Sequence, residues 1–242
     1  KYDNLITFGC SFTGGHHLGE EGSWGYALSN LLECNHVNKW GGGSNTNIFT
    51  NIINYCENND MSNSCIGIQW SELTRREFWE DRWNAYDTLG LGTLIEHPEI
   101  TDGNKKMNFM IENLEFFVSI WFSLPENTLR TVQAMIGAKH YLENKGIDFI
   151  MFEGINSIKT VKIDDYKYDK SQIGDTGLLS KKIRNEILED ISFFNTLGDW
   201  NTAMNKHPEF DPKINDGHPH MEIINWWVNE MYEYIKQNEN KM

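Results

Sequence analysis

The sequence predicts an α/β protein in which helices cover both faces of a central parallel sheet. Short apolar runs typical of buried strands alternate with helical stretches along the chain. Glycine-rich breakers stand between these stretches, and no internal repeat or low-complexity linker interrupts the 242 residues. We therefore expect a single domain over residues 1–242, because strand–helix alternation favours a parallel sheet.

The first third of the chain contains a run of predicted strands and helices. Asn4–Phe8 is an apolar strand that leads into a Gly-Cys-Ser step. Asn35–Trp40 is a short second strand, and Ser64–Trp70 is a third. Helices are predicted between them, over Trp24–Leu32 and over residues 46–57, the second after the breaker Gly-Gly-Gly-Ser-Asn. This order is the one that builds a parallel α/β sheet.

The rest of the chain is less regular. Irregular insertions are expected around residues 72–106 and 155–215, the first over the edge of the sheet. The first insertion begins with the charged and aromatic stretch Glu72–Trp83, which we interpret as a helix that packs its aromatic residues inward. The other predicted elements are helices over 107–122, 126–145, 179–194 and 222–237 and a buried strand over 147–154, with Gly146 as a helix stop.

The charge of the chain limits the partners that it can take. It carries 35 acidic and 21 basic residues, a formal net charge of -14. Binding to nucleic acid depends on cationic side chains that displace counterions, so we expect neither nucleic acid nor an anionic membrane as a partner. No apolar run reaches the roughly 18 residues that span a bilayer, and no signal peptide is visible. We expect a soluble protein. Its location stays open between the cytoplasm, a virus particle and export, and its oligomeric state is open as well.

Neither a metal site nor a bound cofactor is predicted. The four cysteines form no C-x-x-C pair, and we expect free buried thiols at Cys10, Cys34, Cys56 and Cys65. Asp216, His218 and His220 offer three potential metal ligands within five residues. However, Pro219 disturbs the regular alternation of such a ligand set, and no fourth ligand stands out in the sequence.

Polar, glycine-bearing segments follow three of the predicted strands. Ser11 comes directly after the first strand, Gly-Gly-Gly-Ser-Asn (41–45) follows the second, and Gln-Trp-Ser-Glu (69–72) ends the third. In an open parallel sheet, ligands bind outside the carboxyl ends of the strands, so we expect these segments to meet at one site. Ser11 is the candidate nucleophile there. The second segment can also cap the helix that follows it, through Ser44 or Asn45.

These segments resemble sequence blocks of the SGNH, or GDSL-like, hydrolases, which are serine esterases and acyl hydrolases with a flavodoxin-like three-layer α/β/α fold. The first block of that family ends a strand with Gly-Asp-Ser. Phe-Gly-Cys-Ser-Phe-Thr is similar to it, with Ser11 as the nucleophile and Cys10 in place of the aspartate. The second block carries a glycine whose N–H joins the oxyanion hole, and the resemblance places it at Gly42 or Gly43.

The third and last blocks depart from the family pattern. The third is usually Gly-x-Asn-Asp, whose Asn donates to the oxyanion, and here Gln69 takes that place, with Ser71 as the other candidate. The last block pairs an acid with a histidine, and Asn-Asp-Gly-His-Pro resembles it, with His218 as the general base. The usual spacing would use Asn215. We favour Asp216, because a carboxylate orients and stabilises an imidazolium.

The resemblance implies a serine esterase that hydrolyses small acyl esters, such as acetyl groups on a carbohydrate. Ser11 would form the acyl-enzyme, and Cys10 is a weaker candidate because its side chain should point away from that of Ser11. Arg75, or its neighbour Arg76, and Trp70 are candidate substrate-binding residues. Two alternatives stay open: an acyltransferase that uses the same site, and a catalytically silent domain that binds a glycan or forms part of a virus particle.

Overall fold

Four strands of the protein form a parallel sheet. The computed structural model describes residues 2–15, 18–41, 43–71, 75–79, 86–90, 124–154 and 220–238. In the order in which they pair, the strands are β2 (Asn35–Asn38), β1 (Asn4–Phe8), β3 (Ser64–Trp70) and β6 (Asp148–Glu153). All three neighbouring pairs are parallel. The α/β class predicted from the sequence is therefore confirmed.

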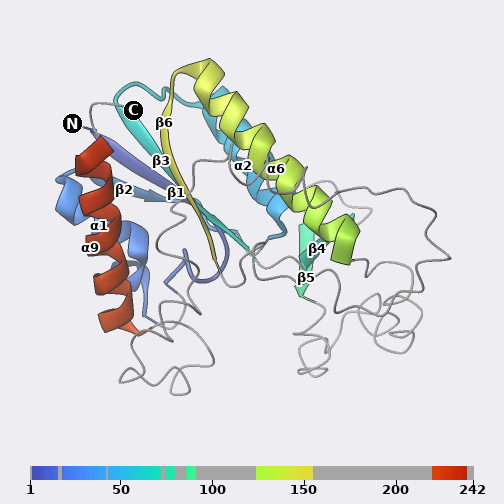
Figure 1. The fold of residues 1–242 in the computed structure, drawn as a ribbon, viewed down its shortest axis with the longest axis horizontal. Helices are drawn as coiled ribbons and strands as arrows, with labels where there is room; N and C mark the ends of the chain where they lie inside the picture. Colours follow the sequence, from blue (N-terminus) through green and yellow to red (C-terminus); the bar gives the residue numbers. More distant parts are fainter. Residues whose placement is uncertain are drawn as a thin grey trace, which may run out of the picture.

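Helices cover both faces of this sheet (Figure 1). α2 (Asn45–Asn58) and α6 (Leu124–Lys145) pack together on one face. α1 (Trp24–Leu32) and α9 (Met221–Asn238) pack together on the other, and a short 3-10 helix, Glu20–Gly22, precedes α1. The described elements thus form the three layers that the sequence predicts.

Side chains of β3 and β6 alternate between two apolar cores. In β3, Ile66, Ile68 and Trp70 are 0% exposed and belong to the core that includes residues of α2 and α6. In β6, Ile150 and Phe152 belong to the second core, which includes residues of α1 and α9. A strand that is buried on both faces forms a nearly continuous apolar run, and this makes both strands recognisable in the sequence.

Local signals set the ends of the helices. The Ser23 side chain accepts a hydrogen bond from the Tyr26 N–H at the start of α1, and Ser44 does the same for the Asn47 N–H at the start of α2. Gly146 follows α6 with a φ of 65°, in the left-handed region that glycine enters without steric cost. The predicted cap at Ser44 and the predicted stop at Gly146 are both confirmed.

The stretch that we interpret as a charged helix contains a strand instead. β4 (Arg75–Trp79) pairs antiparallel with β5 (Tyr86–Gly90), and Trp79 lies opposite Tyr86. The helical interpretation is therefore wrong over these residues. Aromatic residues suit strands at least as well as helices, and the choice depends on a partner strand that lies outside the local sequence window.

Several predicted elements lie outside the described residues. They are the helices over 107–122 and 179–194 and the irregular insertion around 155–215. The prediction of a single domain over the whole chain therefore stays a prediction. Among the helices that are described, none combines the length and the apolar character needed to cross a bilayer.

His36 of β2 should make the stability of the fold depend on pH. Its Nε2 lies 2.9 Å from the Thr7 hydroxyl oxygen of β1, and burial lowers its pKa below the usual 6.5, against the opposing effect of Glu20. The unfolded chain therefore takes up this proton more readily than the folded one. The contribution of His36 to stability is fully present above pH 6.5 and is lost as the pH falls below it.

We expect His36→Gln to remove this contribution, which can reach about 1.4 kcal/mol per pH unit between the folded and unfolded pKa values. The free energy of unfolding in urea should then change less between about pH 7.5 and about pH 5.5 than in the wild type. His140→Gln, at an exposed position on α6, should keep the wild-type dependence. An equal pH dependence in the wild type and His36→Gln would contradict the prediction.

Candidate active site

The loops after β1 and β2 are hydrogen-bonded to each other at the carboxyl edge of the sheet. The Gly41 N–H donates to the Gly9 carbonyl at 3.2 Å. The Asn38 side chain donates to the Thr13 carbonyl at 3.1 Å. These bonds fix the start of the glycine segment beside the turn that carries Ser11. Two of the three segments expected at the site therefore meet.

Ser11 lies in a tight turn directly after β1. The Thr13 and Gly14 N–H groups donate to the Cys10 carbonyl, at 2.9 and 3.2 Å, and close a helical turn around Ser11. Ser11 is partly exposed, whereas Cys10 is 0% exposed. In this arrangement a ligand can approach the serine but not the thiol.

Gly9 lets the Ser11 turn pack closely on β3. A Cβ at Gly9 would lie 2.1 Å from Thr13 Oγ1 and 2.9 Å from the Gln69 carbonyl oxygen. Any side chain would push the turn away from the strand. The turn can therefore pack against β3 only if position 9 is a glycine.

A buried polar network lies beneath the same turn. The Gln69 side-chain oxygen accepts hydrogen bonds from the Trp24 indole N–H at 2.8 Å and from the Thr13 hydroxyl at 2.9 Å. The Gln69 amide nitrogen lies 3.8 Å from the Cys10 sulfur. Both Gln69 and Thr13 are 0% exposed. Gln69 thus joins β3, α1 and the Ser11 turn inside the protein.

These contacts differ from those of an oxyanion donor, which is the role expected of Gln69. An oxyanion donor must aim an N–H at an atom of the substrate. The Gln69 amide is enclosed instead, and a Cβ added at Gly154 would lie 3.1 Å from its nitrogen. In this structure the Gln69 side chain supports the turn that carries Ser11 from inside the protein. Ser71, the other candidate, has a buried hydroxyl without a hydrogen-bond partner in the described part of the chain.

Gln69→Leu should lower the free energy of unfolding by about 1–3 kcal/mol, because it leaves the buried Thr13 O–H without its acceptor and the Trp24 N–H with only its longer bond to Thr13 Oγ1. Urea denaturation measures this loss. Gln133→Leu, at an exposed position of α6, is the control and should stay within about 0.5 kcal/mol of the wild type. Unchanged stability combined with a rate loss of roughly 10²–10³ is the pattern of an oxyanion donor, and it would contradict the supporting role.

Asn45 connects three elements at the site, although the sequence indicates only a possible helix cap. Its side-chain oxygen accepts from the Ser71 N–H at 2.6 Å, and its amide donates to the Ser71 carbonyl and to the Thr131 hydroxyl, both at 3.0 Å. Asn45 is 3% exposed. It therefore holds the end of β3 against α2 and α6. Its partners are 26 and 86 residues away in the chain, so no local pattern reveals them.

The glycine segment expected to bind an oxyanion is described in part. Gly42 lies outside the described residues, and Gly43 is buried directly before the Ser44 cap of α2. A Cβ at Gly43 would lie 2.8 Å from the Asn47 side-chain nitrogen, so a side chain would not fit. Gly43 therefore stands just ahead of a helix N-terminus, where unpaired N–H groups and the helix dipole favour negative charge.

The two expected substrate-binding residues have different surroundings. Trp70 is 0% exposed in the core beneath α2 and α6, so its indole is not placed to touch a ligand. Arg75 begins β4, is partly exposed, and its Nε has no hydrogen-bond partner among the described residues. Arg75 therefore stays a candidate for binding a substrate carboxylate. The side chain of Arg76 lies outside the description.

The expected acid–base block lies in the sequence just ahead of α9. His218, Asp216 and Asn215 are outside the described residues. His220 directly precedes α9, and its carbonyl accepts from the Ile224 N–H at 3.0 Å. His220 is therefore the residue at which α9 begins, and the histidine of the block stands two residues before it.

α9 begins toward the carboxyl edge of the sheet, where β1 and β6 end (Figure 1). The Trp24 indole N–H donates to the Thr13 hydroxyl oxygen at 3.3 Å. The Trp24 ring contacts the Phe152 ring, with 5.0 Å between centroids, and the Phe152 ring contacts the Trp227 ring, with 5.8 Å between centroids. Trp227 lies in the second turn of α9. A continuous set of contacts thus connects Thr13, two residues after Ser11, to the second turn of α9.

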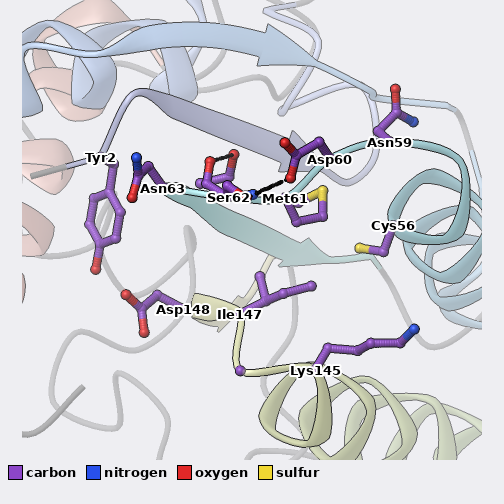
Figure 2. Close-up of a pocket in the computed structure, with 12 residues that line it drawn as sticks. Tyr2, Cys56, Asn59, Asp60, Met61, Ser62, Asn63, Lys145, Ile147 and Asp148 are labelled. Atoms are coloured by element: carbon purple, nitrogen blue, oxygen red, sulfur yellow. Dashed lines mark hydrogen bonds between the residues drawn. The ribbon is translucent and has the colours of Figure 1, made fainter.

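A cavity of about 630 Å³ lies at the opposite edge of the sheet (Figure 2). It is lined by residues near the amino ends of β1, β3 and β6, and its charged side chains are Asp60, Lys145 and Asp148. Lys145 is paired with Glu57 at 2.9 Å, and Asp60 accepts a hydrogen bond from Ser62. Ligands of open parallel sheets bind at the carboxyl edge, so we place the candidate active site at Ser11 and not in this cavity.

Comparisons with known proteins find similarity to solved structures alone. No family model matches the chain, and no curated protein matches it. Among solved structures, it is similar to one described as a "putative lipolytic protein of G-D-S-L family from Desulfitobacterium hafniense DCB-2". The two sequences are 12% identical, the match covers 96% of this chain and 98% of that chain, and the TM-score is 0.48. This similarity is too small to carry an argument, so function has to be argued from the site itself.

Proposed function

We propose that the protein is a serine ester hydrolase that cleaves small acyl esters, such as acetyl esters of carbohydrates. The placement of Ser11 carries this proposal. It is a partly exposed serine in a tight turn at the carboxyl edge of a parallel sheet, with the turn fastened from below by Gln69. A serine on a sharp turn after a strand is held in place by its backbone and can be reached by a substrate, as acyl transfer requires.

His218 is the general base in this proposal. It takes the proton of Ser11 Oγ as the oxygen attacks the ester carbonyl, and it returns that proton to the leaving alcohol. Asp216 orients the ring and stabilises the imidazolium, with Asn215 as the alternative at that place. Water then attacks the acyl-enzyme with His218 again as base, which releases the acid and frees Ser11. The start of α9 toward the carboxyl edge of the sheet supports this assignment.

Backbone N–H groups bind the oxyanion in the proposed mechanism. They come from Ser11 and from Gly42 or Gly43, ahead of the N-terminus of α2. Gln69 is engaged beneath the turn, so we assign any side-chain donor to Ser71, whose hydroxyl has no hydrogen-bond partner among the described residues and whose backbone Asn45 holds. The substrate-binding role that we propose for Arg75 is to bind a carboxylate of the substrate.

A fluorophosphonate directed at activated serines tests the proposal. The serine oxygen attacks phosphorus, fluoride leaves, and a stable phosphonate ester remains on the protein. We expect mass spectrometry to find the adduct on the peptide that contains Ser11 in the wild type, and no adduct in Ser11→Ala. A wild type that neither forms the adduct nor hydrolyses p-nitrophenyl acetate would contradict the proposal and favour the catalytically silent alternative.

A further inference from the structure

Trp40 is a large apolar side chain that the fold leaves in contact with water. It follows β2 and is 48% exposed, whereas Trp24, Trp70 and Trp227 are each 0% exposed. In the described ranges, Trp40 is the one large apolar side chain with this exposure. Single exposed tryptophans occur on many proteins, so the significance of this one depends on what holds it and what it adjoins.

Hydrogen bonds fix the backbone at Trp40 beside the Ser11 turn. The Trp40 N–H donates to the Asn38 side-chain oxygen at 3.2 Å, and the next N–H along the chain, that of Gly41, donates to the Gly9 carbonyl at 3.2 Å. Asn38 in turn donates to the Thr13 carbonyl at 3.1 Å. The indole is therefore carried by a backbone that is anchored on both sides to the segment around Ser11.

One face of the indole rests on Gly14, within the Ser11 turn. A Cβ at Gly14 would lie 2.6 Å from Cδ2, 2.8 Å from Cε2 and 3.0 Å from Cγ of Trp40. Cδ2 is bonded to three other ring carbons, so it can be approached this closely only through a face of the ring. Gly14 thus allows the indole to lie flat against the turn, and the exposed surface of the ring stays available to a ligand.

An aromatic surface fixed beside a nucleophile selects a ligand that also has a flat, weakly polar face. A sugar ring has such a face, because its axial C–H hydrogens carry partial positive charge that the negative face of an indole attracts. An acyl chain would need an enclosing apolar groove instead, and the residues before Trp40 are the polar Asn38 and Lys39.

We propose that Trp40 is a stacking platform for the sugar ring of a carbohydrate ester whose acyl group reaches Ser11. That the ligand is an ester rests on the proposed function. Binding of its sugar ring to Trp40 does not require that the ester is hydrolysed. It names a substrate-binding tryptophan other than Trp70, which is enclosed in the core.

Two acetate esters separate stacking from chemistry. Peracetylated methyl β-xyloside has a ring, and glycerol triacetate is an acetylated polyol without one. Trp40→Ala should lower kcat/KM for the xyloside about tenfold more than for glycerol triacetate, mainly through KM. Trp40→Phe keeps a flat ring and should restore most of that preference. Equal losses on the two esters would mean that Trp40 only supports the turn, and would overturn the proposal.

Binding without turnover distinguishes this inference from the proposed function. In a Ser11→Ala protein, calorimetry should show that the further change Trp40→Ala weakens xyloside binding about tenfold. Binding that does not depend on Trp40, or no binding at all, overturns the stacking proposal even where the wild type hydrolyses esters. Binding that depends on Trp40 in a protein whose wild type hydrolyses neither ester supports stacking and contradicts the hydrolase proposal.

Discussion

Ser11→Ala should lower kcat/KM for p-nitrophenyl acetate by at least about 10³-fold. The substitution removes the oxygen that would form the acyl-enzyme bond, and the oxyanion donors alone leave only a small residual rate. The turn itself should survive, because it is closed by backbone hydrogen bonds to the Cys10 carbonyl and fastened by the bond between Thr13 and Gln69. Thermal unfolding, measured beside the kinetics, should therefore change little.

Matched variants identify the source of this loss. Ser62→Ala changes an exposed serine at the opposite edge of the sheet and should keep the wild-type kcat/KM. His218→Ala should cost about as much as Ser11→Ala, and the double variant little more, because the two groups act as a unit. Undiminished activity in Ser11→Ala would exclude Ser11 as the nucleophile. A greater loss from Asn215→Ala than from Asp216→Ala would move the acid to position 215.

Asn45→Leu should lower the free energy of unfolding by about 3–5 kcal/mol. Leucine fills a similar volume, but it leaves the N–H and the carbonyl of Ser71 and the Thr131 hydroxyl without their partner in a buried place. Each such group costs about 1–3 kcal/mol when it is unpaired. Urea denaturation, with the slope checked for two-state behaviour, measures the loss.

Two further substitutions control for the effect at Asn45. Asn58→Leu, at an exposed position in the same helix, removes a hydrogen bond to the Asn54 carbonyl and should cost no more than about 0.5 kcal/mol. Thr131→Val removes one of the three hydrogen bonds that Asn45 makes. Its loss of unfolding free energy should lie between those of Asn58→Leu and Asn45→Leu. If Asn45→Leu proves as stable as Asn58→Leu, Asn45 does not hold the end of β3.

The strands and helices that are buried and locally regular could be predicted with close bounds. β1, β3 and α1 begin and end at the predicted residues. β2 ends at Asn38, two residues before the predicted end at Trp40. Beyond Asn38, the Trp40 N–H donates to the Asn38 side chain and the Gly41 N–H donates to the Gly9 carbonyl, and these contacts have no signature in the local sequence.

The candidate site was predictable in position but not in detail. Glycine and polar residues after consecutive strands indicate a common edge, and the contact between Gly41 and Gly9 bears this out for the first two strands. The environment of Gln69 was not predictable. Its hydrogen-bond partners Trp24 and Thr13 lie 45 and 56 residues away, and only the packed fold brings their side chains together.

The sequence by itself determined the fold class, the cap at Ser44, and the placement of a serine at the end of the first strand. Each of these depends on residues near one another in the chain, where periodicity and local hydrogen bonding decide the conformation. Only the tertiary structure decided that Gln69 lies beneath the Ser11 turn, that residues 75–79 form a strand, and that Trp40 faces water. These outcomes depend on side chains that meet across the sheet and between loops, and a linear pattern does not encode which distant partner satisfies a buried polar group.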